Sequence, residues 1–450
     1  MKKEILLFLL LINTVFSDET AGRSAYEIRK TELEDRGIGI EGVYTGDWFT
    51  NIQGGLRRGS NRLSVFDLIL SMDLEKLFQW KNAVFYSDFI GIQGKDPSEY
   101  TGDIQKISNI AAENTWKIYE AWLQQKFRAG RLSVLMGIYD LNSEFDVTET
   151  AGLFINSSHG MGPDFSQSGK NGAPTFPYPD LAVRLKVEVK ENFYWQSVIM
   201  DGVPGNPERP QAIDFRINKN NGALLASEFS YIKGYEKIVS STYPCKRKQR
   251  RGRGLGYKKP GRSGRGLKRY RNSAAIEIPD DRYLKIALGG WYYSAEFDDL
   301  YNDYSSGNPV QHKGNWGVYA LGEKIFYSRK NNPAGAFSAF CRVGLADKRI
   351  NRIDKYIGAG VVFSGIPRKR FNGQTGIAIA AAHNSEIYKK AMLQQNKQID
   401  NWEVNLEFSN RIMINKWLYF QPDIQYILNP GFDPANNNAL TVGMRIEVSF

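Results

Sequence analysis

The chain has 450 residues, 24% of them charged and 13% aromatic, and a formal net charge of +11. Its two cysteines, Cys245 and Cys341, are too few for a scaffold built on disulfides, and their local settings give no reason to pair them. The positive charge is concentrated in residues 246–271. The rest of the chain holds 46 of the 59 basic residues and all 48 acidic residues. The body of the protein is nearly neutral, and nucleic acid is not an expected partner.

The first residues have the layout of a secretory signal. Lys2 and Lys3 precede an apolar stretch, Ile5 to Ile12, and the segment ends on Val15-Phe16-Ser17. We therefore predict a signal peptide over residues 1–17. No later run of eighteen apolar residues predicts a helical membrane span. Residues 18–37 are predicted to form an N-terminal periplasmic segment, and the composition of residues 24–36 favours a helix.

Apolar and polar residues alternate at period two along much of the remaining chain. In residues 181–190 the odd positions are Leu or Val, while Arg184 and Lys186 occupy even positions. The same alternation recurs in residues 402–408, 418–426 and 440–450. Strands place successive side chains on opposite faces, so each of these segments predicts a strand with one apolar and one polar face.

Charged faces that persist from strand to strand argue against a packed core and predict a hydrated lumen, with the apolar faces turned to lipid. A soluble β-sandwich is the alternative, because its strands alternate too. The chain ends on Phe450 within the pattern, as expected for an assembly signal read by the barrel assembly machinery, and its connections alternate between short and long. We therefore predict an all-β fold: a transmembrane antiparallel β-barrel over residues 38–450, with sixteen strands and a long constriction loop folded into the lumen.

Several motifs resemble one family of channel proteins. Between Gly137 and Leu185 they are residues 139–146, 151–160 and 162–169, and elsewhere residues 119–123, 288–292, 421–426 and 429–431. Together they resemble the carbohydrate-selective porin family, OprB, over nearly the whole chain after the signal. The resemblance implies a sixteen-stranded barrel in the outer membrane, a long loop inside the channel, and passive uptake of mono- or short oligosaccharides.

The basic insertion, at about residues 245–275, departs from the short turn that the family has at this place. Thirteen Lys and Arg residues with interspersed Gly, as in residues 250–254, are typical of disorder. Binding to an anionic cell-wall or lipid component would make the protein a structural outer-membrane protein that tethers the wall. A tolerated insertion or a reading-frame error is the alternative explanation.

The strand predicted over residues 116–127 offers a first candidate site. Tyr119, Ala121, Leu123 and Phe127 are assigned to the lipid face, which turns Glu120, Trp122, Gln124 and Lys126 inward. A tryptophan beside a carboxylate can hold a sugar, because the ring covers C–H patches and the carboxylate accepts from hydroxyls. Trp122 is therefore either a sugar platform or a wall residue under the long loop.

The long loop, residues 140–179, offers a second candidate site, since a connection of this length is expected to narrow the lumen. Its acidic side and the opposed basic candidates of the wall are expected to create a transverse field across the constriction. The acidic side comprises Asp140, Asn142, Glu144, Asp146 and Glu149, and the basic candidates are Arg62, Arg184, Lys186 and Arg445.

Catalysis is not expected. His159, His312 and His383 are scattered over predicted loops and show no nucleophile arrangement or metal-ligand spacing. We predict no cofactor. The expected partners are small sugars in transit, outer-membrane lipid and lipopolysaccharide, and the assembly machinery. A general or differently selective porin remains an alternative function, and the pattern leaves a monomer and a homotrimer both open.

Overall fold

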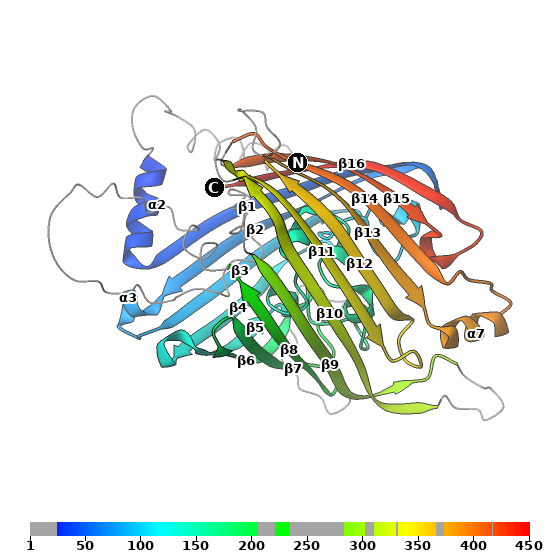
Figure 1. The fold of residues 1–450 in the computed structure, drawn as a ribbon, viewed down its shortest axis with the longest axis horizontal. Helices are drawn as coiled ribbons and strands as arrows, with labels where there is room; N and C mark the ends of the chain where they lie inside the picture. The colour runs from blue at the N-terminus through cyan, green and yellow to red at the C-terminus, as the bar shows by residue number, and fades with distance from the viewer. Residues whose placement is uncertain are drawn as a thin grey trace.

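The computed structural model describes residues 25–205, 221–234, 283–301, 310–329, 332–365, 373–415 and 417–450. Within them, sixteen antiparallel strands form a closed barrel, as predicted, and every strand pairs with the strands before and after it (Figure 1). The seam joins β1 to β16. The strands are β1 Ile38–Gly55, β2 Gly59–Asp73, β3 Ala83–Gly94, β4 Thr115–Phe127, β5 Leu132–Tyr139, β6 Asp180–Lys190, β7 Phe193–Asp201, β8 Ala223–Lys233, β9 Leu284–Asp298, β10 Gln311–Arg329, β11 Asn332–Ala346, β12 Ile353–Ser364, β13 Gly373–Asn384, β14 Trp402–Met413, β15 Leu418–Leu428 and β16 Asn437–Ser449.

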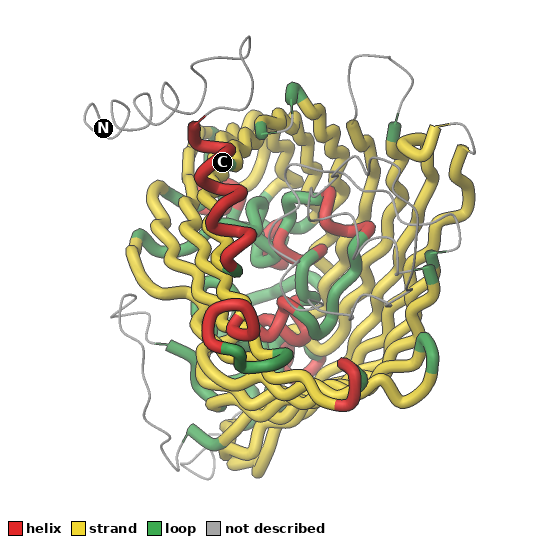
Figure 2. Tube along the Cα trace, turned by 90° about the vertical axis from the view of Figure 1, so that its left-hand side faces the viewer, coloured by secondary structure: helices red, strands yellow, loops and turns green. Residues whose placement is uncertain are grey.

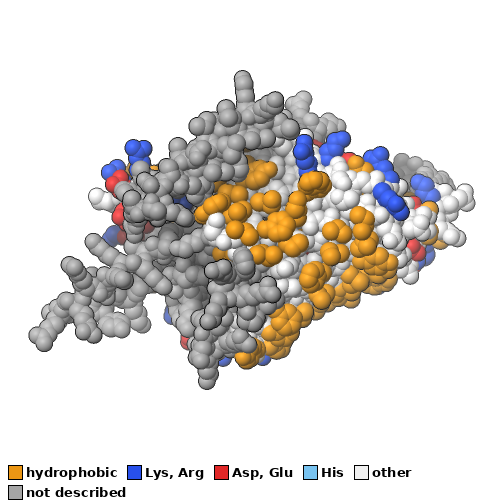
Figure 3. All heavy atoms as spheres, turned by 90° about the horizontal axis from the view of Figure 1, so that it is seen from above, with side chains coloured by type: hydrophobic (Ala, Val, Ile, Leu, Met, Phe, Trp, Pro, Cys, Tyr) orange, Lys and Arg blue, Asp and Glu red, His pale blue; other side chains and the backbone are white. Residues whose placement is uncertain are grey.

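The period-two alternation sets which side chains face outward. In β6, Val183 is 49% exposed on the outside while its neighbour Arg184 is fully buried. In β16, Val442 and Ile446 are likewise exposed and Thr441 is buried. Figure 3 shows hydrophobic side chains spread over the outer wall on the face that it draws. The apolar face of the strands is therefore the outer surface, as the alternation predicted.

The helices are short and lie between the strands or before them. The helix predicted over residues 24–36 is present as α2, and none of the described helices is long and apolar enough to cross a membrane. The signal segment, Cys245 and the basic insertion lie outside the described residues. The helices are α2 Ala25–Arg36, α3 Leu74–Phe78, α4 Ser98–Thr101, α5 Pro163–Ser166 and α7 Glu386–Gln394, with 3-10 turns η1 Arg128–Gly130, η2 Leu141–Ser143, η3 Thr150–Leu153, η4 Ser157–His159 and η5 Pro430–Phe432.

Two connections at the same end of the barrel turn back into its interior. We call residues 95–114, between β3 and β4, the first inner loop, and residues 140–179, between β5 and β6, the second inner loop. Hydrogen bonds join the second inner loop to β10 and to β14, far from its own strands. Figure 2 shows loop and helix segments inside the ring of strands. The constriction loop expected from the sequence therefore crosses the lumen.

Part of the inward polar face is not the hydrated lumen lining that the alternation suggested. Asn405 and Gln425 are fully buried, and Glu407 is 1% exposed. For these residues the prediction was wrong, because the inner loops cover this part of the strands and buried polar groups need partners that the loops supply. The interior beside them is therefore a packed polar core, whereas other inward residues, among them Arg411, Tyr419 and Glu447, line an open cavity.

Candidate functional site

A large cavity inside the barrel has a volume of about 890 Å³. It lies between the two inner loops and the inward faces of β1, β2, β4 and β10–β16. Its charged lining is nearly balanced, so the cavity has no strong preference for one sign of charge. The acidic residues are Asp67, Asp103, Glu149 and Glu447, and the basic residues are Lys106, Arg411 and Arg445.

At one wall of this cavity, Arg445 joins the barrel seam to the first inner loop. Its Nε and Nη2 lie 2.7 Å from the two carboxylate oxygens of Asp47 on the adjacent strand β1. Nη2 also donates to Oδ1 of Asn109 at 2.8 Å. Such a two-point ion pair holds both side chains in one geometry. The structure places Arg445 on the inward face of β16, in the lining of the large cavity.

Beside Arg445, three further side chains present donors and acceptors to the cavity. The Tyr419 hydroxyl donates to Oε2 of Glu447 at 2.5 Å, and the Arg411 guanidinium lies 4.8 Å from the centre of the Tyr419 ring. Arg411 also donates to the carbonyl of Gly152 in the second inner loop at 2.9 Å. Arg411 therefore spans from the wall to the loop. We call Asn109, Arg411, Tyr419, Arg445 and Glu447 the polar cluster.

The second inner loop is held by wall glutamates that accept hydrogen bonds from its backbone. Glu323 of β10 accepts from the amides of Glu149 and Thr150, at 3.0 and 2.7 Å. Glu407 of β14 accepts from the amides of Ile155 and Asn156, at 2.5 and 3.0 Å. A carboxylate that takes two amide donors satisfies groups that would otherwise be buried without partners.

Three more glutamates of the wall repeat this arrangement on other strands. Glu120 of β4 accepts from the amide of Asp140 at 3.1 Å, and Glu228 of β8 accepts from the amide of Asp146 at 3.0 Å. Glu403 of β14 holds the first inner loop instead, accepting from the amides of Ile104 and Gln105 at 3.1 Å. The inner loops are thus attached around the barrel by five carboxylates.

A buried arginine provides the opposite contact, from the wall to carboxylates of the loop. Arg342 of β11 donates to both oxygens of Asp146, at 3.1 and 2.7 Å, and also to Asp164. Its guanidinium lies 5.5 and 5.2 Å from the ring centres of Tyr319 and Tyr356. Arg342 was not among the residues predicted from the sequence, although its place on the inward face of a strand was a usable signal.

The acidic side of the loop does not face the predicted basic residues across an open constriction. Glu144 is bound directly by Arg184 and Lys186, with Nε–Oε2 and Nζ–Oε1 distances of 2.7 and 2.9 Å. Burial acts to raise the pKa of Glu144, but the charges of Arg184 and Lys186 hold that pKa well below its usual range. The predicted transverse field is therefore wrong for these three residues, which neutralise one another locally.

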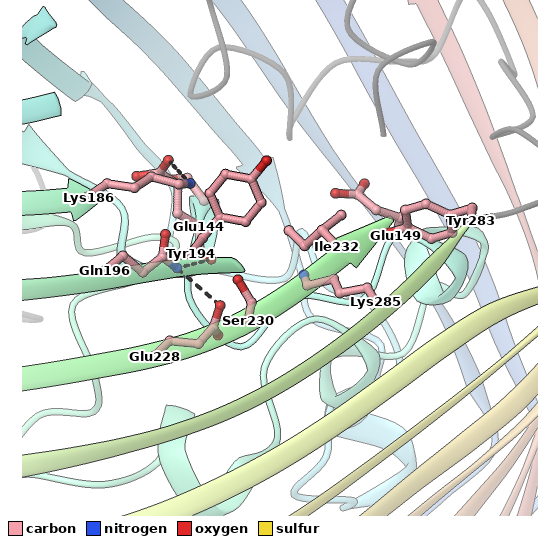
Figure 4. Close-up of a pocket in the computed structure, with 11 residues that line it drawn as sticks. Glu144, Glu149, Lys186, Tyr194, Gln196, Glu228, Ser230, Ile232, Tyr283 and Lys285 are labelled. Atoms are coloured by element: carbon pink, nitrogen blue, oxygen red, sulfur yellow. Dashed lines mark hydrogen bonds and ion pairs between the residues drawn. The ribbon is translucent and has the colours of Figure 1, made fainter. Parts of the chain in front are cut away.

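Beside Glu144 a second cavity, of about 40 Å³, lies against strands β6–β9. Figure 4 shows Lys186 pointing to Glu144, and Gln196 pointing to Glu228. This volume accommodates only a molecule or two of water, by the roughly 30 Å³ that each water occupies in the liquid. The second cavity is therefore too small for a sugar.

Trp122 occupies the wall and does not line the large cavity. It is 3% exposed, stacks on Tyr86 with ring centres 4.8 Å apart, and donates from Nε1 to Oε1 of Glu120 at 3.2 Å. Of the two readings of Trp122, the structure supports the wall residue under the long loop. Gln124 is likewise inward and buried, as predicted.

The assignment of Tyr119 to the lipid face was wrong. In the β3–β4 register, Asp88 pairs with Glu120 while Phe89 pairs with Ile118, so Tyr119 is an extra residue in a β-bulge. Its side chain turns inward, is 1% exposed, and donates to Oδ2 of Asp140 at 2.5 Å. Period-two counting failed here because the bulge shifts the phase by one residue.

Arg62 also departs from its predicted place in the lumen. It pairs across β1–β2 with Trp48, which is exposed on the outer wall, and Arg62 is itself exposed. The inward residues on either side of it are Asn61 and Leu63. The inward face of β2 is partly apolar because Val65 packs into a cluster under the inner loops. In β2, apolar residues such as Val65 therefore lie on the inward face, so they did not identify the lipid side of this strand.

The remaining candidates are divided between the cavity and the attachment of the loop. Asn142 and Glu149 line the large cavity, whereas Asp140 and Asp146 do not. Asp140 accepts from the amide of Asn142 at 2.8 Å and so caps the turn η2. The cavity thus brings together Asn142, Glu149 and Arg445 from the predicted set, with Arg411, Tyr419 and Glu447, which were not predicted.

Comparison with known proteins places this geometry among channel proteins. The family model described as "Carbohydrate-selective porin, OprB family" matches residues 57–450. Porin B of Pseudomonas aeruginosa is 24% identical over 454 residues, covering 94% of this chain and 89% of that protein. The high-pH structure of Pseudomonas putida OprB matches with a TM-score of 0.77 and 21% identity, over 97% of this chain and 100% of the other. The low-pH structure of that protein covers the same shares, with a TM-score of 0.55 and 17% identity.

Proposed function

The chain belongs to the carbohydrate-selective porin, OprB family, and we propose that mono- and short oligosaccharides cross its barrel through the large cavity beside the polar cluster. It is an outer-membrane porin, a passive channel and not an enzyme. The observation that carries the choice of route is the cavity itself. Its volume of about 890 Å³ lies within the range of roughly 300–1,000 Å³ typical of small-molecule sites.

The polar cluster has the chemistry that a sugar needs. Arg411 and Arg445 offer N–H donors and Glu447 offers acceptors, and each pairs with a neighbouring protein group that a hydroxyl can replace or join. A channel must bind its solute weakly enough to release it, and contacts shared with protein partners keep the binding weak. Because the lining charges nearly cancel, the passage favours a neutral solute over an ion of either sign.

Single-channel recording in a planar bilayer, with glucose and short glucose polymers titrated in, tests this proposal. We expect a concentration-dependent, saturable block of the ion current. The variant Arg411→Gln should weaken the block severalfold, because it removes the cation between Tyr419 and the loop carbonyl of Gly152. Lys190→Gln, at an exposed position at the end of β6 and eight strands from β14 around the barrel, is the matched control and should block like the parent protein.

Each outcome decides a separate claim. A conductance that ignores sugar in the parent protein would contradict the carbohydrate proposal and favour a general porin with the same barrel. A normal block in Arg411→Gln would leave sugar passage standing and remove the polar cluster as its site. If Trp122→Phe reduced the sugar block and Arg411→Gln did not, the sugar-binding site would lie at Trp122 in the wall of β4.

A further inference from the structure

A group of exposed cations lies at the outer rim of strands β11–β14, at the barrel end that carries the long connections. The group, which we call the rim cations, consists of Lys348, Arg349, Lys355, Lys390 and Lys397. Figure 3 shows Lys and Arg side chains beyond the hydrophobic surface, toward the end that carries α7 in Figure 1. In an outer-membrane barrel the long connections face the cell exterior, so this rim meets the outer leaflet.

The acidic residues among the rim cations are mostly buried and already paired. Asp347 binds Arg349 with an Oδ2–Nη2 distance of 2.6 Å, and its side chain is 5% exposed. Asp354, also 5% exposed, binds Nδ1 of His383 at 2.6 Å. Glu386 alone of the three is well exposed, at 58%, and lies 3.7 Å from Nζ of Lys389.

The lysines of the rim therefore keep their charge available to solvent. Within the described parts of the chain, no acidic side chain lies within 4.0 Å of the ammonium groups of Lys348, Lys355, Lys390 and Lys397. The first inner loop at the same end of the barrel differs, because residues 95–114 hold four acidic and two basic residues. The β11–β14 arc is thus more positive than the first inner loop at the same end of the barrel.

An apolar wall begins directly below these cations. Lys355 pairs across the strands with Leu345, and Ile357 follows two residues later on the same outward face. Leu345 and Ile357 are 51% and 46% exposed on the outer wall.

We propose that the rim cations bind the phosphate groups of a phosphorylated glycolipid in the outer leaflet, while its acyl chains lie along Leu345 and Ile357. The cations lie above the apolar wall, and in such a lipid the anionic groups likewise lie at the surface with the hydrocarbon chains beneath. Each Lys or Arg near an anionic membrane surface contributes roughly 1 kcal/mol, so two lysines together account for about a thirtyfold change in affinity. The proposal does not depend on which solute the channel passes.

Native mass spectrometry of the detergent-purified barrel, titrated with diphosphorylated lipid A, tests this inference. We expect the parent protein to retain the lipid and the double variant Lys348→Gln/Lys355→Gln to bind it at least tenfold more weakly. Lys81→Gln/Lys190→Gln removes two exposed lysines from the opposite rim and should bind lipid A like the parent protein. Unchanged heat-modifiable gel migration in all three proteins would show that the barrels fold alike.

Two parallel titrations separate lipid from a bare anion. Lipid A without its phosphates should bind weakly to every protein, and millimolar inorganic phosphate should not displace diphosphorylated lipid A. Equal retention of lipid A by the parent and the Lys348→Gln/Lys355→Gln variant would overturn the proposal. So would an equal loss in the opposite-rim control, or full displacement by inorganic phosphate, which would indicate a simple anion site.

Discussion

The ring of Phe450 occupies the space beside Gly42 where a side chain would otherwise project. A Cβ atom on Gly42 would lie 2.3 Å from Cε2 of Phe450, while the two backbones exchange hydrogen bonds of 3.0 and 2.9 Å. This contact extends the β1–β16 ladder that closes the barrel, and it lies at one end of that seam.

Gly42→Ala should therefore weaken the seam by about 1–3 kcal/mol, the usual cost of overpacking. The temperature at which the barrel loses its compact gel migration measures this effect. In a Phe450→Ala background the same substitution should cost little, because the clash is gone. Gly290→Ala is the control, since its new Cβ would lie 3.4 Å or more from any neighbour. Additive effects of the two seam substitutions would contradict the proposed clash.

Glu407→Gln should loosen the second inner loop. The glutamine amide places an N–H₂ group against the backbone N–H of Ile155 or Asn156, which leaves buried donors without an acceptor at about 1–3 kcal/mol. We expect a larger and noisier single-channel conductance with weaker sugar block. Glu386→Gln, on the exposed helix α7, should leave the conductance unchanged. A quiet channel of normal conductance in Glu407→Gln would show that the loop does not depend on this contact.

Arg342→Ala should be more damaging, because it leaves Asp146 and Asp164 buried without their cation. Removing one member of a buried ion pair costs about 3–5 kcal/mol. Limited proteolysis of the folded protein should then cut within residues 140–179, where the parent protein resists. Arg349, which pairs with Asp347 and is half exposed, provides a contrast. Arg349→Ala should lower the stability by no more than about 1 kcal/mol. Similar protease resistance in both variants would contradict this account.

Acid should destabilise the barrel partly through His159. Its ring lies between Phe154 and Phe340, and burial lowers the pKa of His159 from 6.5 to about 3. The unfolded chain therefore binds more protons between these values, so the stabilisation is complete above pH 6.5 and is lost as the pH falls toward 3. His159→Gln should show a smaller loss of unfolding temperature between pH 7 and pH 5. Parallel pH profiles for the two proteins would refute this contribution.

The strands and their number followed from local patterns in the sequence. A strand alternates its side chains whatever lies on either side of it, so residues such as Val183 and Val442 marked the lipid face without knowledge of the fold. The even count and the alternation of short and long connections likewise depend only on neighbouring strands. For this reason the barrel could be predicted, and so could the inward placement of Arg184 and Arg445.

The tertiary structure alone decided which inward residues line the open passage and which hold the inner loops. Glu407 and Glu447 look alike in the pattern, but Glu407 lies under the second inner loop and Glu447 faces the cavity. The partners of Glu407 are backbone N–H groups, which every residue except proline possesses, so no side-chain pattern in the loop predicts the contact. Tyr119 shows the same limit in a strand, because its bulge depends on the register with β3. The sequence by itself determined the strands that form the wall of this porin. The path of the loops through the barrel determined which inward residues line its passage.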